Sequence, residues 1–257
     1  MNFAFVKIEF WRLIRMILRY PMELLGSVVG AVVVFSLFFS GVHYLSGPDL
    51  LGDRLEALVI GLLSWSLAFS LLSNTASTLS EEALAGLLEQ LVLTKPGLLG
   101  VVLIRAALSL LHIGLLNVPI FLAVLLSSQA QLHIQPILLP LLAALASGSL
   151  GIGLALGGLA LIHKRIGQLL GLLQFALLGL FLVRFETLPG SWGMLSYALP
   201  LAPVVSALRE TAGRGHALET ALFLWAIANA IAYLIIGILL FARSLRFARQ
   251  KGLLNIH

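Results

Sequence analysis

The sequence predicts an all-α polytopic membrane protein with six transmembrane helices, and its composition and hydropathy point the same way. Of the 257 residues, 60% are hydrophobic and 11% are charged, whereas soluble domains have about 45–50% apolar and about 25% charged residues. The mean hydropathy is +1.06. A helix needs about 20 apolar residues to cross a bilayer, so the chain has room for about six crossings with short loops. We therefore expect residues 1–257 to form one transmembrane domain.

Residues 1–20 predict an amphipathic helix that lies along the membrane surface before the first span. Four basic residues fall in one sector of a helical wheel, and the apolar residues lie mainly away from it: Lys7, Arg12, Arg15 and Arg19. Such a face favours anionic lipid headgroups. Because the apolar run after Pro21 is long enough to span a membrane, we expect this segment to be retained rather than cleaved.

Six apolar segments follow. The expected spans are 22–44, 57–72, 98–126, a fourth that begins at Pro136, 166–183 and 220–242. In the fourth span, Ser149, Gly153 and Gly157 recur at intervals of four, which favours close packing against another helix. Between the last two spans, Pro200 and Pro203 interrupt residues 184–219. This interruption predicts two short outer helices, or a re-entrant pair, rather than another crossing.

The segment 73–97, between the second and third spans, predicts a separate short amphipathic helix over residues 79–93. Thr78 and Glu81 have the spacing of a capping box. Leucines recur on one face: Leu84, Leu87, Leu88 and Leu91. Glu81, Glu82 and Glu89 occupy the other side, where they can meet a soluble partner. An ordinary interfacial connector is the alternative interpretation.

The distribution of basic residues predicts the orientation of the chain. With both termini, residues 73–105 and the turn 163–165 on one side, twelve of the 16 Lys and Arg residues share that side. The other four lie opposite: Arg54, Arg184, Arg209 and Arg214. Since cytoplasmic loops carry the excess of Lys and Arg, we expect both termini in the cytoplasm. The expected location is a plasma membrane of the bacterial inner-membrane type.

Several chemistries are excluded by what the sequence lacks. None of the four lysines belongs to a phosphate-binding Gly-Lys-Ser/Thr loop. The chain has no cysteine, and no two of its six histidines are spaced for zinc binding on one helix. We therefore predict no catalytic residues, no cofactor or metal site in this chain, and no nucleic-acid partner.

The polar residues inside the expected spans are uncharged. We predict that a translocation path involves five of them, on the second and fifth spans: Ser64, Ser66, Ser70, Gln168 and Gln174. No carboxylate falls near the middle of a span, which disfavours an ion-coupled carrier. A mildly polar, mostly aliphatic lining suits an amphipathic or lipid-like substrate better than an ion.

The order of these features resembles the permease subunit of type-2 ATP-binding-cassette exporters. The stretch Glu81-Glu-Ala-Leu-Ala-Gly-Leu-Leu-Glu-Gln-Leu-Val-Leu-Thr94 is similar to the coupling segment of that family, and Leu199-Pro-Leu-Ala-Pro203 to its outer helices. The basic tail that ends in Lys251-Gly252 is also similar. Heme-exporter permeases, with a comparable coupling stretch, are a possible subclass.

The resemblance implies an exporter subunit that is not itself an enzyme. A separate ATPase would bind ATP and Mg, and a second permease copy, identical or related, would complete the path within the membrane lipids. The residues that it implies for coupling are Glu81, Glu82, Leu84, Leu87, Leu88, Glu89 and Gln90. A membrane-embedded lipid-modifying enzyme and an ion-coupled secondary carrier are the alternatives.

Overall fold

The computed structural model describes residues 11, 14–15, 19, 21–46, 52–86, 97–128, 132–163, 165–184 and 196–251. Within these ranges the protein is all-α and contains no strand. The helices are α2 (Pro21–Ser46), α3 (Gly52–Leu84), α5 (Gly97–Ser128), α6 (Leu138–His163), α7 (Gly167–Leu182), α9 (Ala202–Leu208), the π-helix η3 (Arg209–Gly213) and α10 (Thr220–Gln250). The predicted all-α class is confirmed.

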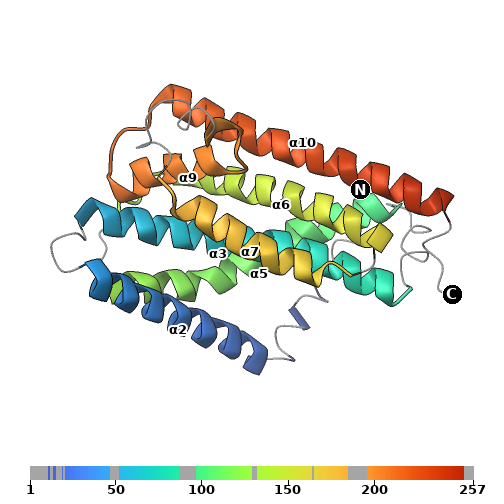
Figure 1. The fold of residues 1–257 in the computed structure, drawn as a ribbon, viewed down its shortest axis with the longest axis horizontal. Helices are drawn as coiled ribbons and strands as arrows, with labels where there is room; N and C mark the ends of the chain where they lie inside the picture. Colours follow the sequence, from blue (N-terminus) through green and yellow to red (C-terminus); the bar gives the residue numbers. More distant parts are fainter. Residues whose placement is uncertain are drawn as a thin grey trace.

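The long helices lie side by side, and successive helices along the chain run in opposite directions, so that α3, α6 and α10 are parallel to one another (Figure 1). Contacts run from α2 to α5, from α5 to α3, from α3 to α6 and from α6 to α10, while α7 packs on α3. The short helices α9 and η3 lie at the end where α10 begins, at the left of Figure 1. We call this the connector end, and the opposite end, where α3 and α10 finish, the C-terminal end.

Four helices in the described part of the chain are long and apolar enough to cross a membrane. They cover Leu55–Leu84, Gly100–Leu126, Leu138–His163 and Thr220–Gln250. The other two predicted spans coincide with shorter apolar stretches, Val28–Leu37 within α2 and Gly167–Leu182. At 1.5 Å per residue, the 16 residues of α7 extend about 24 Å, which is less than the roughly 30 Å of a hydrocarbon core.

The prediction of a separate helix that starts at Thr78 is wrong, because α3 continues unbroken to Leu84. The hydroxyls before that point turn back onto the helix: Ser73 donates to the Ser70 carbonyl, Thr75 to Leu71 and Ser77 to Asn74. Side chains bonded in this way leave the backbone helical. The helix ends at Leu84, and two residues later Gly86 has a positive φ of 68°, which suits glycine in the turn after a helix.

Small residues on α6 let two helices approach it closely. A Cβ at Gly153 or Gly157 would meet Leu72 and Thr75, or Leu79, on α3. A Cβ at Gly151 would overlap the α10 backbone, and one at Gly237 of α10 would overlap the Gly151 carbonyl. The predicted small-residue row therefore packs against α3, and a second row on α6 packs against α10.

Between residues 184 and 219, where short helices were predicted, the structure has α9 and η3. Pro203 lies in the first turn of α9, where the missing N–H costs no hydrogen bond. All residues of α9 are buried. This segment fills the space between α3, α6, α7 and α10 at the connector end.

The predicted surface helix at 1–20 lies mostly outside the described residues. Trp11, Ile14, Arg15 and Arg19 are described and have helical backbone. The side chain of Trp11 is half exposed.

Candidate functional site

A cavity of about 420 Å³ lies between α3, α5 and α6 in the half of the bundle nearer the connector end. Each helix lines it over two turns, with Ile60–Leu67, Gly114–Phe121 and Leu138–Leu145, so its walls extend about 10 Å along the helix axes. Leu208 and Ala212 close it on the side of α9 and η3. A volume of this size falls within the range of about 300–1,000 Å³ that is typical of small-molecule sites.

Part of this space is open because residue 114, at the cavity wall on α5, is a glycine and has no side chain to fill it. A Cβ at Gly114 would meet no atom within 4 Å. One helical turn away, Asn117 is held in place: its amide nitrogen donates to the Ile113 carbonyl at 2.8 Å, and its oxygen accepts from the Ser66 hydroxyl at 3.1 Å. The bond from Ser66 links α3 to α5 beside the cavity.

The cavity walls are mostly aliphatic and carry no charge. The residues that line it include no Asp, Glu, Lys or Arg. Four of them are polar: Ser64, Asn117, His133 and Gln135. Such a lining suits an uncharged or weakly polar ligand, because burying an unpaired ion would cost far more than burying hydrocarbon.

Ser64 is the most deeply buried of these polar residues, with 4% of its surface exposed. Within the described parts of the chain its hydroxyl has no hydrogen-bond partner. The buried hydroxyls of Thr75, Ser149 and Thr211 differ, because each donates to the carbonyl four residues earlier. A buried hydroxyl normally has a partner. Ser64 is therefore available to a molecule in the cavity.

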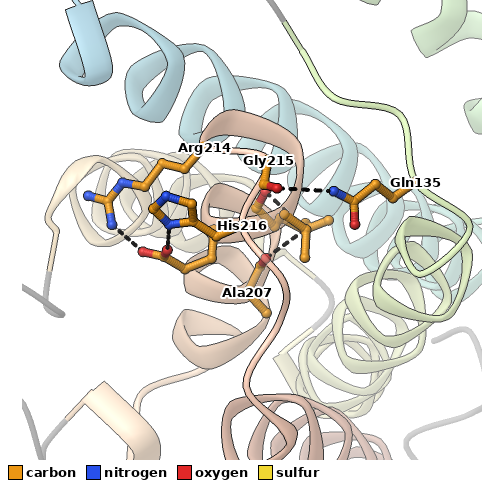
Figure 2. A network of polar contacts seen from close by, with 8 residues as sticks. Gln135, Ala207, Arg214, Gly215 and His216 are labelled. Carbon is orange, nitrogen blue, oxygen red and sulfur yellow. Dashed lines mark hydrogen bonds and ion pairs between the residues drawn. The ribbon is translucent and has the colours of Figure 1, made fainter.

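The connector 132–135 covers the rim of the cavity and is tied to the turn after η3. The His133 amide donates to the Ala212 carbonyl at 2.8 Å. Gln135 Nε2 donates to the Gly215 carbonyl at 3.4 Å (Figure 2). Gly215 has a φ of +65°, and a Cβ there would come within 2.9 Å of the His133 ring. Only a glycine allows both this backbone and this approach.

Three charged or titratable side chains stand just beyond the rim. Arg214 forms an ion pair with Glu210, and His216 Nδ1 lies 3.3 Å from the same carboxylate (Figure 2). Thr211 donates to the Ala207 carbonyl one turn earlier at 2.8 Å. Polar groups thus collect at the connector end of the cavity, while its walls are apolar.

A second, polar pocket of about 30 Å³ lies between α3 and α5, nearer the C-terminal end. Glu82 and Arg105 form an ion pair across it. Glu82 is only 8% exposed, and in the described chain its second oxygen has no hydrogen-bond partner. The expectation that the Glu82 carboxylate is exposed to a partner is therefore wrong, because Arg105 neutralises it inside the bundle.

The other residues predicted for coupling are only partly described. Glu81 and Leu84 are exposed at the end of α3, as a contact surface would require. Leu87, Leu88, Glu89 and Gln90 lie outside the described residues. Their predicted role stays a prediction.

The structure does not gather the five residues predicted for the translocation path. Ser64 lines the cavity, and Ser66 holds Asn117 at its edge. Gln168 is exposed on α7. Gln174 is also on α7, and its backbone carbonyl accepts from Trp65 at 3.0 Å. Neither glutamine nor Ser70 lines the cavity.

His133, Gln135 and Gly114 are cavity residues that the predicted path did not include. His133 and Gln135 follow the third span in a polar stretch typical of an ordinary loop. The signal in the sequence was a lone glycine three residues before Asn117, in an otherwise apolar helix, since isolated helical glycines often have a packing or functional reason.

The fold and the cavity together define a class of protein. The four long apolar helices identify a polytopic helical membrane protein. Three of them, α3, α5 and α6, line a cavity whose walls include no Asp, Glu, Lys or Arg. Comparison with known protein families and with curated proteins finds no match for this chain. In the described residues, no three His, Asp or Glu side chains come together as a metal site would require.

Proposed function

We propose that this protein is the permease subunit of an ATP-driven exporter that moves an amphipathic, lipid-like substrate. The main observation that supports this proposal is the uncharged cavity inside the helical bundle. Its walls are hydrocarbon with a few hydrogen-bonding groups, among them Ser64 and Asn117. Such walls suit an amphiphile, whereas a site for an ion would need charged or more numerous polar ligands.

The order of the helices supports a permease of the type-2 family. In this proposal the shorter apolar helices α2 and α7 cross the membrane together with α3, α5, α6 and α10, and α9 and η3 lie between the last two of the six. Six crossings place both termini on the same side. In this arrangement α3 ends and α5 begins at the C-terminal end of the bundle, where a soluble ATPase would dock.

Charge supports the same orientation. Near the C-terminal end, the described basic residues include Arg105, Arg165, Arg243, Arg246, Arg249 and Lys251. At the connector end they are Arg54, Arg184, Arg209 and Arg214. By the positive-inside rule the C-terminal end faces the cytoplasm and the cavity lies in the outer half of the membrane.

Energy would have to come from another chain. None of the four lysines belongs to a phosphate loop, so ATP and Mg are assigned to a partner ATPase, and a second permease copy would complete the transporter. An ion-coupled carrier is less well supported, because the buried carboxylate of Glu82 is already paired with Arg105.

The test is to purify the affinity-tagged chain from its native membranes and ask whether a nucleotide-binding subunit accompanies it in fixed proportion. We expect Glu81→Lys and Glu89→Lys to reduce recovery of that subunit severalfold while the permease stays folded. Arg165→Glu, in the turn between α6 and α7, is the matched charge reversal at the same end.

Two results would count against the proposal. A purified chain that binds no ATPase, and whose transport is driven by an ion gradient instead, would contradict the exporter assignment. If Arg165→Glu alone removed the ATPase, docking would belong to the 163–165 turn.

A further inference from the structure

The cavity has an unused hydrogen-bonding group at its wall. Only 4% of the surface of Ser64 is exposed, and its hydroxyl makes no hydrogen bond to the described part of the protein. Since Ser64 lines the cavity, a bound molecule can supply the missing partner.

Asn117, which also lines the cavity, can form a second hydrogen bond to a bound molecule. A side-chain amide has two N–H groups, and only one bond donated by Asn117, to the Ile113 carbonyl, is present. Its oxygen already accepts from Ser66. Asn117 can therefore donate to an acceptor, and Ser64 can donate or accept.

The cavity also opens sideways between α5 and α6. Val118 on α5 and Leu139 and Leu142 on α6 line it, and yet they are exposed on the flank of the bundle, Leu139 by 72%. In a membrane, exposed leucines on a spanning helix face lipid tails. The route into the cavity is therefore lined by hydrocarbon, without a charged residue among the cavity walls.

We propose that this cavity binds an uncharged, single-chain amphiphile. Its hydroxyl or carbonyl group bonds to Ser64 and Asn117, and its hydrocarbon chain leaves between α5 and α6 into the membrane. The chain need not fit inside the roughly 10 Å of cavity wall, because it continues into the bilayer. This inference names the substrate class of the proposed exporter and so rests on that proposal.

The first test blocks the cavity. The probe is a photoreactive C16 alcohol, cross-linked to the purified chain in phosphatidylcholine vesicles without any ATPase. Gly114→Leu places a side chain in open space at the cavity wall. Gly171→Leu on α7 makes the same change where a Cβ also meets nothing within 4 Å, outside the cavity.

We expect saturable labelling of the parent and of Gly171→Leu, and at least a tenfold loss in Gly114→Leu. The labelled peptides should come from α3, α5 or α6 near the cavity. Equal labelling of both variants would overturn the proposal.

The second test removes only the hydroxyl. Ser64→Ala should weaken binding of the alcohol about two- to tenfold, as expected for one hydrogen bond. Ser147→Ala on α6 is the control, because the Ser147 hydroxyl donates to the Ala144 carbonyl and lies outside the cavity. A matched hydrocarbon probe without the hydroxyl should bind the parent and Ser64→Ala equally. Equal binding of the alcohol to parent and Ser64→Ala would contradict the assigned contact.

A third arm separates this inference from the exporter proposal. When the co-purified ATPase and ATP are added, an exported substrate should leave the site, and labelling of the parent should fall. Labelling that depends on Gly114 and Ser64 but ignores ATP hydrolysis would support the binding site as one for a resident lipid and contradict the exporter. If labelling responded to ATP hydrolysis but did not change in Gly114→Leu or Ser64→Ala, the result would contradict the binding site and leave the exporter proposal standing.

Discussion

Buried polar residues hold the ends of this bundle together. At the connector end, Asn229 of α10 accepts from the Leu201 amide at 3.0 Å and donates to the carbonyls of Tyr197 and Leu199 at 2.9 and 3.1 Å. Leu201, at the start of α9, has a φ of +61°, which a leucine rarely adopts. One amide thus fixes the turn that leads into α9.

We predict that Asn229→Leu destabilises the protein by about 1–3 kcal/mol, because it leaves the buried Leu201 amide unpaired. Asn229→Asp should also destabilise it, since a carboxylate can accept that bond but cannot donate to the two carbonyls. Thermal unfolding in detergent measures both. Asn74→Asp, an exposed site on α3, is the control for an added charge. Full stability of Asn229→Asp would show that the two donated bonds contribute nothing.

The ion pair of Glu82 and Arg105 links α3 to α5 in the same way. Glu82→Gln and Arg105→Gln should each destabilise the protein, Arg105→Gln by about 3 kcal/mol, because it leaves a buried carboxylate without its partner. The double variant Glu82→Gln/Arg105→Gln should lose less unfolding free energy than the sum of the losses in the two single variants. A double-mutant cycle of unfolding free energies, with Glu81→Gln as the exposed control, measures this coupling. Strictly additive losses would contradict it.

At the scale of elements, hydrophobic segments were predictable and their ends were not. The predicted spans at 98–126 and 166–183 nearly match α5 and α7. The second span continues as α3 twelve residues beyond its predicted end, to Leu84. The sixth continues as α10 through the basic tail to Gln250, where basic side chains suit the end of a helix.

The seam between α6 and α10 depends on the absence of side chains. Gly151→Val and Gly237→Val should each cost about 3 kcal/mol or more, because the added carbons overlap the backbone of the facing helix. Gly179→Val on α7 is the matched control, as a Cβ there meets no atom within 4 Å. The yield of folded protein and its thermal midpoint report the difference. If Gly151→Val were as stable as Gly179→Val, the close approach of α6 and α10 would be wrong.

At the scale of the whole molecule, the sequence predicted a polytopic helical protein and placed Ser64 among candidate site residues, but it did not predict the cavity. A cavity depends on which faces of three helices meet, and periodicity does not determine such pairings. Likewise the pairing of Glu82 with Arg105 joins residues 23 positions apart on two helices. The short capping pattern at Thr78 was misleading because the tertiary structure extends α3 past it.

The proposed orientation makes a prediction about access from each side. Since the chain has no cysteine, single cysteines can be placed at the exposed positions Glu81, His216 and Arg249. A membrane-impermeant maleimide should label position 216 from outside intact cells and the other two only after permeabilisation. Labelling of position 81 from outside would contradict the orientation.

The central claim is that ATP hydrolysed by a partner moves an amphiphile through this permease. The most direct measurement is the movement of a fluorescent long-chain alcohol in inverted vesicles that contain the chain with its co-purified ATPase. We predict transport that requires both subunits and hydrolysable ATP, is lost in Gly114→Leu and persists in Gly171→Leu. Transport without the ATPase, or no response to ATP when both subunits are present and folded, would contradict the claim.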